Sequence, residues 1–249
     1  MAARRVRAAA AAARWNPERA LMPPRLSVVM PTLNESATIQ FALQALAPLA
    51  ARGAQILVAD GGSSDTTAQL ARVGNAQLIN VARGRARQMN AAAQQASGDI
   101  LLFLHADTQL PINADKLITQ ALANGQPVWG RFDVQIEGKP RMLRVIAMFM
   151  NLRSRWTGIA TGDQAMFMTR AAFDAVGGFP GQPLMEDIEM SARLLKLSRP
   201  VCLRERVVTS GRRWETRGVW RTVLLMWRLR FAYWRGAAPE RLAALYRSS

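Results

Sequence analysis

Four apolar runs, each followed by a polar turn and then by a segment with helical spacing, constrain the fold most strongly. Strands that alternate in this way with helices of ten to fifteen residues indicate an α/β fold, a doubly wound and mostly parallel sheet flanked by helices. A chain of 249 residues that is 50% hydrophobic can form one such domain with a smaller appendage. The expected strands lie at 25–31, 54–60, 76–82 and 98–107.

Polar residues and glycines gather where these four strands end. In parallel sheets, ligands bind at the carboxyl ends of the strands, so the sequence predicts a polar pocket at that edge. No G-x-G-x-x-G follows a strand and no Walker A motif is present, which argues against a dinucleotide fold or a P-loop. The four strand ends read Pro31-Thr32-Leu33-Asn34-Glu35, Asp60-Gly61-Gly62-Ser63, Arg83-Gly84-Arg85 and His105-Ala106-Asp107.

Asp60 follows a buried run and precedes two glycines, which let the backbone approach a ligand closely. Its carboxylate could accept hydrogen bonds from a nucleobase edge or a ribose hydroxyl. The alternative is a local Asx-type turn or a helix cap, a role for which Ser63, Ser64 and Asp65 compete. Both readings remain open from the sequence.

Asp107 and His105, the single histidine of the chain, close the fourth run. A carboxylate there suits Mg²⁺, which takes one or two protein carboxylates and completes its shell with phosphate oxygens and water. Residues two apart on a strand point to one face, and Mn²⁺ accepts imidazole more readily than Mg²⁺. His105 could ligate the metal, although a hydrogen bond to a metal ligand or to a diphosphate is favoured. The simplest alternative is a strand that leaves the core and meets water.

Glu186 and Asp187 open a predicted helix after the glycine- and proline-rich stretch 177–183. We expect Ile188, Ala192 and Leu195 to share one face of this helix. Acids in a first turn often serve only as partners of the helix dipole. One of the pair could instead act as a general base toward an attacking hydroxyl.

The positive charge lies at the two ends of the chain. The formal net charge is +16, but residues 26–203 are nearly balanced, so nucleic acid is not expected as a partner. Residues 1–25 form an Arg- and Ala-rich tail without the apolar core of a signal peptide, and we expect it to be poorly ordered and the protein to be cytoplasmic. Met22 is an alternative start. Cys202, the only cysteine, is expected to be a structural thiol.

Four blocks in this order resemble a family 2 glycosyltransferase with the GT-A fold, over about residues 26–200: "SVVMPTLNESATI", "ILVADGGSSDTT", "GRARQMNAAAQQASGDILLFLHADT" and "TGDQAMFMTRAAFDAVGGFPGQPLMEDIEM". The "FLHADT" block and the tail "RRWETRGVWRT" further resemble a bacterial subgroup associated with radical-SAM neighbours and arsenosugar biosynthesis. This likeness divides the chain into the tail 1–25, a catalytic domain 26–204 and a basic, aromatic helical extension 205–249.

The resemblance implies inverting transfer of a sugar from a nucleotide-diphosphate donor to an acceptor hydroxyl. Asp187, with Glu186 beside it, matches the catalytic base. Asp107 matches the last Asp of the D-x-D element that holds Mg²⁺ or Mn²⁺, and His105 replaces the first. Ser210 stands where a Q-x-x-R-W element has Gln. Donor binding is expected from Pro31, Asn34, Glu35, Asp60, Arg83, Arg87, Asp163, Arg213 and Trp214.

Two stretches, 140–156 and 217–236, have aromatic and aliphatic residues on one helical face and Arg on another. Interfacial helices share this chemistry, so contact with the inner face of a membrane is one reading. The alternative is that both helices pack on the catalytic domain. No run of 18 apolar residues occurs.

Other functions are weaker matches to the sequence. A sugar-nucleotide pyrophosphorylase would need a Gly-rich loop with Arg and Lys directly after the first strand, and "PTLNESA" offers none. A nucleic-acid-binding protein would rely on the Arg-rich ends. A relative that binds nucleotide sugars without turnover is a further alternative.

Overall fold

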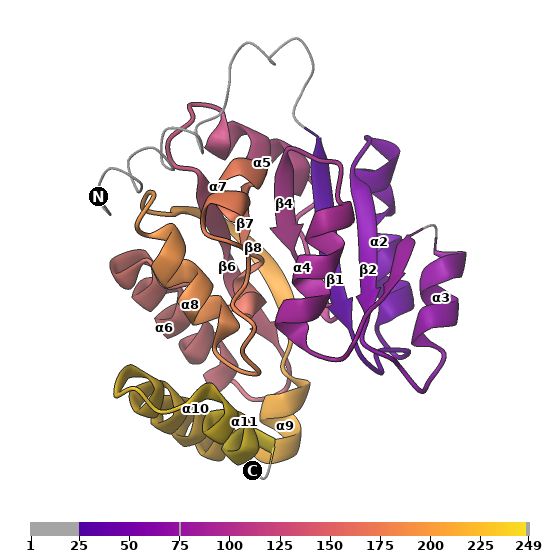
Figure 1. The fold of residues 1–249 in the computed structure, drawn as a ribbon. Coiled ribbons are helices and arrows are strands. Elements are labelled where there is room, and N and C mark those ends of the chain that lie inside the picture. The colour runs from indigo at the N-terminus through magenta and orange to yellow at the C-terminus, as the bar shows by residue number, and fades with distance from the viewer. Residues whose placement is uncertain (1–24, 75, 248–249) are drawn as a thin grey trace.

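The computed structural model describes residues 25–74 and 76–247. The expected tail 1–25 therefore lies outside the described residues, apart from Arg25. Figure 1 shows a twisted central sheet with helices on both faces, and three C-terminal helices packed at one end of it. This is the expected mixed α/β architecture with a C-terminal helical part.

The described residues form one eight-stranded sheet in the order β3-β2-β1-β4-β7-β6-β8-β5. The pairs β1–β2, β2–β3, β1–β4 and β6–β8 are parallel, whereas β4–β7, β6–β7 and β5–β8 are antiparallel. The strands are β1 (Leu26–Thr32), β2 (Gln55–Asp60), β3 (Gln77–Asn80), β4 (Ile100–Phe103), β5 (Thr108–Gln109), β6 (Trp129–Glu137), β7 (Phe167–Thr169) and β8 (Val201–Ser210).

Successive residues of the central strands enter two different cores, because side chains alternate between the faces of a sheet. Val28 and Met30 pack on one side with helices α2 (Ile39–Ala51), α3 (Thr67–Val73), α5 (Ala114–Leu122) and α6 (Met142–Thr157). Val29 packs on the other side with α4 (Arg85–Gln95), α7 (Arg170–Ala175) and α8 (Glu186–Leu194). Burial on both faces explains why the strands are continuous apolar runs.

The ends of the parallel strands are held in register at one edge of the sheet. Thr32 pairs with Asp60, and Asp60 pairs with Asn80. The buried side-chain amide of Gln88, on α4, donates to the carbonyls of Thr32 (2.6 Å) and Ala59 (2.8 Å). This contact fixes the loops after β1 and β2 relative to each other.

The fourth strand is shorter than expected. The prediction placed Asp107 at the end of a strand, but β4 ends at Phe103 and residues 104–107 form a turn, in which the Thr108 N–H bonds to the His105 carbonyl at 3.1 Å. The argument that His105 and Asp107 share a strand face is therefore wrong. Residues Ile100–Phe103 pair with β1, and Ile100–Leu102 also pair with β7.

Two further expectations need correction. The strand expected over 76–82 spans only Gln77–Asn80. On α8 the buried positions are Glu186, Met190, Ser191 and Leu194, rather than the predicted face of Ile188, Ala192 and Leu195. Those three are half-buried, and Ile188 packs against the C-terminal helices. The helix is covered on two sides, which apolar spacing alone did not reveal.

The C-terminal helices are α9 (Arg212–Arg217), α10 (Val219–Trp234) and α11 (Pro239–Arg247). The strand β8 continues across residue 204, and the helical part begins only at Arg212. Leu229 and Leu242 form a small core with Met185, just before α8. This contact places α10 beside the helix that carries Glu186 and Asp187. Within the described residues, no helix has both the length and the apolar character needed to cross a membrane.

Candidate active site

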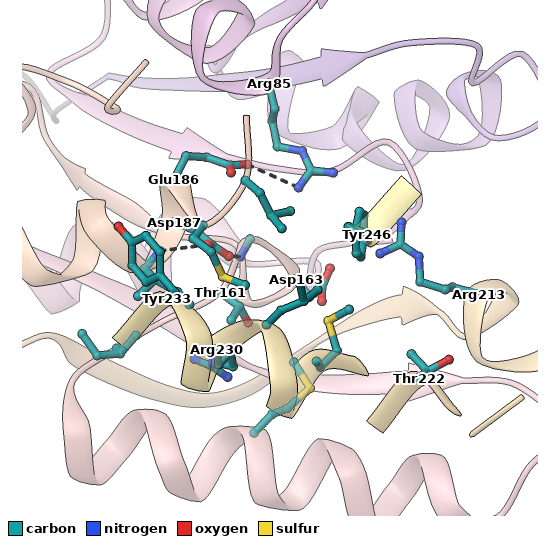
Figure 2. A pocket seen from close by; sticks show the side chains of 18 of the residues that line it. Arg85, Thr161, Asp163, Glu186, Asp187, Arg213, Thr222, Arg230, Tyr233 and Tyr246 are labelled. Carbon is teal, nitrogen blue, oxygen red and sulfur yellow. Dashed lines mark hydrogen bonds and ion pairs between the residues drawn. The ribbon is translucent and has the colours of Figure 1, made fainter. Parts of the chain in front are cut away.

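A cleft of about 1680 Å³ lies between the carboxyl edge of the sheet, α6, α8 and the C-terminal helices. Figure 2 shows carboxylates and arginines from several of these elements directed into it. Segments far apart in the sequence meet here because the strand ends and the start of α8 lie at the same edge of the sheet. Its charged and polar lining includes Glu35, Arg85, His105, Asp107, Asp163, Glu186, Asp187, Arg212, Arg213 and Trp214, with Pro31 beside them.

Asp187 lies in the first turn of α8 and is half-buried. Its Oδ2 accepts from the N–H of Gly162 at 2.9 Å, and its Oδ1 accepts from the N–H of Ile188 at 2.8 Å. Burial and then the negative charge of Glu186 raise the pKa of Asp187 to about 6, although both hydrogen bonds and Arg85 act in the opposite direction. A carboxylate with such a pKa can take up a proton near neutral pH.

Glu186 is 3% exposed and lies within 3.4 Å of the Arg85 guanidinium. Burial by itself would lower the pKa of Arg85. The negative charges of Glu186, Asp187 and Asp163 have the larger combined effect and raise it. Arg85 thus stays cationic between the carboxylates. Half of its side chain remains exposed to the cleft, so it can also contact a bound anion.

His105 contacts the loop that precedes β7 rather than a neighbouring strand. Its Nδ1 lies 3.3 Å from Asp163 Oδ1, in the short 3₁₀ helix η2 (Gly162–Gln164). Burial would raise the pKa of Asp163, but the hydrogen bond and charge of His105, with Arg85 and Arg213, lower it. The imidazole and Asp163 therefore orient each other.

Asp107 is half-buried and borders the start of α9. Its backbone carbonyl accepts from the Ser210 N–H at 3.3 Å, which connects the turn after β4 to the end of β8. From the residues that the structure describes, its carboxylate accepts a single long hydrogen bond, of 3.4 Å from Thr108 Oγ1. Most of its lone pairs are thus available to a ligand.

Arg213, on α9, contributes a second cation to the cleft. Burial lowers its pKa, as do Arg85 and Arg217, whereas Asp163 and Asp107 counteract this effect. Its guanidinium stacks over the ring of Tyr246 at 4.7 Å, a contact with α11 that sequence reasoning missed. Trp214 lines the same cleft, and Arg212 lies 3.8 Å from Glu35 across it.

Asp60 and Asn34 lie beside this cleft lining and not within it. Asp60 is 3% exposed and accepts from the N–H groups of Gly62 and Ser63, which is the Asx-type turn that the sequence left open. Asn34, with a φ of 54°, accepts from the Ser64 N–H. These bonds join the loops after β1 and β2. Contact of Asp60 and Asn34 with a nucleoside stays a prediction.

Arg83 and Arg87 were predicted to bind the donor, but the arginine of this segment that lines the cleft is Arg85. Arg83 and Arg87 are exposed and do not belong to the cleft lining, whereas Arg85 does. Arg83 precedes α4, which begins at Arg85, and Arg87 lies two residues further along the helix, a spacing that does not bring side chains to one face. A donor-binding role for Arg83 and Arg87 stays a prediction.

The donor set allows a divalent cation but not one held by protein alone. Across residues 25–74 and 76–247, no three His, Cys, Asp or Glu side chains cluster closely enough to form a metal site. Asp107 offers a largely unengaged carboxylate at the cleft edge, and His105 lies in the same lining. Mg²⁺ and Mn²⁺ fit such a set when substrate phosphates complete the shell.

The sequence model of Glycosyl transferase family 2 matches residues 27–179. The chain belongs to this family. The match spans β1 to β7 and includes Asp60, Asp107 and Asp163, but it ends before Asp187. Among curated relatives of this family 2 chain, a probable glycosyltransferase of Bacillus subtilis, YdaM, is 25% identical over 237 residues, covering 86% of this chain and 55% of YdaM. The chain thus spans about half the length of the curated relatives it matches.

Solved structures of glycosyltransferases share the fold. Staphylococcus aureus TarS, residues 1–349 in complex with UDP, superposes with a TM-score of 0.60 at 20% identity, covering 75% of this chain and 60% of TarS. The mannosyltransferase PcManGT of Pyrobaculum calidifontis, in complex with GDP-Man and Mn²⁺, superposes with a TM-score of 0.60 at 21% identity, covering 97% and 77%. At these identities the likeness establishes a GT-A architecture.

Proposed function

We propose that this family 2 chain transfers a sugar, with inversion, from a nucleotide-diphosphate donor to an acceptor hydroxyl. The observation that carries the proposal is the position of Asp187. It is a half-buried carboxylate with a pKa of about 6 that lines the same cleft as Asp107, Arg85 and Arg213. A proton acceptor and a set of groups suited to a diphosphate therefore border one space.

The carboxylate of Asp187 serves as the general base. Hydrogen bonds from Gly162 and Ile188 fix its orientation. As the acceptor oxygen forms its bond to the anomeric carbon, its proton passes to Asp187, and the bond between that carbon and the diphosphate oxygen breaks. One displacement with one base inverts the anomeric centre and needs no covalent intermediate.

Cationic side chains stabilise the departing nucleoside diphosphate. Arg85 on α4 and Arg213 on α9 both line the cleft. Hydrogen-bond donors that are already in position before the reaction stabilise the developing charge without having to move. Asp107 would hold Mg²⁺ or Mn²⁺, with His105 as second ligand or as a donor to the diphosphate. When bound, the cation neutralises charge on the phosphate oxygens. The Mn²⁺ and GDP-Man in the PcManGT complex support this assignment.

A donor screen tests the proposal. Melting temperature is measured with UDP-, GDP- and dTDP-sugars, each with and without Mn²⁺, for the parent chain and for Asp107→Asn. One donor should raise the melting temperature in the presence of Mn²⁺ only, and the variant should lose this increase. Donor hydrolysis and transfer are then followed with that sugar nucleotide. If none of the donors raises the melting temperature, the proposal is contradicted. Binding of a donor without turnover would favour a nucleotide-sugar-binding protein.

The narrower placement in the bacterial subgroup with radical-SAM neighbours rests on the "FLHADT" block and on "RRWETRGVWRT". Both segments border the cleft, the first through His105 and Asp107 and the second through Arg212, Arg213 and Trp214. Segments that share a site vary together when the substrate changes. Assay of an acceptor panel against the identified donor tests this placement.

We also propose contact with an anionic membrane surface. Apolar side chains on α6 and α10 are exposed, such as Trp156 (80%) and Trp220 (66%), and arginines flank them. Both helices also pack on the catalytic domain, α6 through Leu143 and Ala147 and α10 through Leu229, but the exposed apolar residues lie outside those contacts. An apolar face with neighbouring Arg matches the chemistry of anionic headgroups over acyl chains. The exposed apolar residues that do not line the cleft are Met142, Val145, Met148, Leu152 and Trp156 on α6, and Trp220, Leu224 and Phe231 on α10.

Vesicle flotation tests this contact. The protein should float with vesicles that contain phosphatidylglycerol, and less with pure phosphatidylcholine. The double variant Trp220→Ser, Leu224→Ser should lose flotation, whereas Val73→Ser, at an exposed apolar residue on α3, should retain it. Equal flotation of both variants would contradict the proposal.

A further inference from the structure

The side of the cleft between α6 and α10 has a different lining from the strand-end side. There the walls are mainly apolar, and they carry two arginines, Arg153 on α6 and Arg230 on α10. None of the groups assigned to the donor lies on these two helices. The apolar lining residues are Ile146, Phe149, Met150, Val223, Met226 and Trp227.

Arg153 has buried polar atoms without a partner. Its Nε and Nη2 are inaccessible to solvent and make no hydrogen bond to any described residue. Its neighbour Arg155 differs, because its guanidinium pairs with Asp133 at 2.7 Å and donates to the Cys202 carbonyl. A buried donor without an acceptor costs free energy, on the order of 1–3 kcal/mol. A structural arginine at this position would be expected to have a carboxylate or carbonyl nearby.

Arg230 is also without a counter-charge. Burial lowers the pKa of its guanidinium, and no carboxylate offsets this effect. It forms no ion pair or hydrogen bond with any residue in 25–74 or 76–247. In Figure 2, Arg230 lies on the α10 side of Asp187 and Thr161. Two cations to which the described residues offer no counter-charge thus line the α6 and α10 side of the cleft.

We propose that this half of the cleft binds an acceptor that carries an anionic group, a phosphate or a carboxylate, beside an apolar portion. Arg153 and Arg230 bind the anion, and the apolar residues of α6 and α10 cover the rest of the acceptor. The inference rests on the proposed transferase function, since it names the class of acceptor. An anion bound here supplies acceptors for the buried N–H groups of Arg153 and a negative charge beside Arg230.

Binding of octyl phosphate, measured by isothermal titration calorimetry on the full chain below the micellar concentration, tests the inference. Octanol provides the same apolar portion without charge, and inorganic phosphate provides the anion alone. The variants are Arg153→Gln and Arg230→Gln. Arg144→Gln and Arg228→Gln are matched controls, because these arginines are exposed on the same two helices and do not line the cleft.

Octyl phosphate should bind more tightly than octanol or inorganic phosphate. Each cleft variant should weaken its binding about tenfold, the size expected for loss of one charge-assisted hydrogen bond, and each control should leave it unchanged. Equal binding of octanol, or no change in both cleft variants, would overturn the anion site. Equal binding of inorganic phosphate would overturn the apolar part.

Two measurements keep this result separate from the proposed function. UDP- or GDP-sugar binding and hydrolysis by water should be the same in the cleft variants and the parent, because neither arginine is assigned to the donor. The melting temperature of the Gln variants should be equal to or above that of the parent, since an unpaired buried cation has been removed. Arg230→Lys, which keeps the charge, should retain part of the octyl phosphate affinity.

Discussion

Gly162 and Asp187 are joined by a hydrogen bond of 2.9 Å from a backbone N–H to a carboxylate oxygen, across 25 residues of sequence. The same glycine contacts His105, because a Cβ at this position would lie 2.5 Å from Nε2. Gly162 therefore holds the proposed base, Asp187, close to the imidazole of His105.

Gly162→Ala should displace His105 and weaken its contact with Asp163. The added methyl group is closer to the imidazole than real Cβ contacts allow, so the ring must move. We expect transfer activity to fall at least tenfold with a change in melting temperature of only a few degrees, on the order of a 1 kcal/mol perturbation. Gly181→Ala, where a Cβ would meet nothing within 4 Å, is the control. Unchanged activity in Gly162→Ala would count against this account.

Asp187→Asn should remove transfer while leaving donor binding intact. The amide keeps the size of the side chain but cannot accept the proton of the acceptor hydroxyl, which typically costs about 10²- to 10⁴-fold in rate. Steady-state kinetics should show the loss in kcat, and calorimetry with the donor should show an unchanged Kd. Retention of more than a tenth of the parent kcat would exclude Asp187 as the base.

Transfer should rise with pH through about 6. The raised pKa of Asp187 means that the carboxyl is protonated, and inactive as a base, below that value. The value of kcat/KM should be about tenfold lower at pH 5 than at pH 7, with a midpoint that belongs to the Glu186–Asp187 pair. Glu186→Gln should shift the midpoint to lower pH, since it removes the negative charge next to Asp187. A shift to higher pH would contradict this coupling.

The same raised pKa has a consequence for stability. A carboxyl whose pKa is higher in the folded state than in the unfolded state stabilises the fold at low pH, and this contribution is lost as the pH rises through about 6. Asp187→Asn should therefore increase the melting temperature more at pH 8 than at pH 4. Paired thermal melts of variant and parent check the sign, and a larger increase at pH 4 would argue against it.

The variants Asp107→Asn and His105→Ala should distinguish metal binding by Asp107 from the orienting role of His105. If His105 only orients Asp163 and contacts the diphosphate, His105→Ala should retain Mn²⁺-dependent donor binding while kcat falls. Asp107→Asn should abolish that metal dependence. Titration of Mn²⁺ in the presence of donor measures both. Equal loss of Mn²⁺ affinity in the two variants would instead make His105 a direct ligand.

The order of strands and helices, and the gathering of polar residues at the strand ends, could be predicted from the sequence. Apolar runs such as Val28–Met30 and Leu101–Phe103 are buried on both faces, so their composition marks them as central strands. The family could also be predicted, because the motifs around Asp60 and Asp107 lie in a fixed order within residues 27–179, which the family model matches.

The cleft lining depended on contacts between segments that the sequence leaves far apart. Arg85 rather than Arg83 or Arg87 faces Glu186, because that depends on where α4 begins. Tyr246 stacks on Arg213 only because α11 folds back on α10. No local pattern indicates such pairings, since they arise from the packing of whole helices.

By itself the sequence determined the α/β class, the family and the set of acidic residues available for chemistry, because these follow from local periodicity and motif spacing. Only the tertiary structure decided the surroundings of each side chain: Asp187 and Asp107 border one cleft, Asp60 closes its own turn, and the described residues offer no partner to Arg230 or to Nε and Nη2 of Arg153. The physical reason is that burial, pKa and pairing depend on neighbours brought together by packing, and those neighbours come from distant parts of the chain.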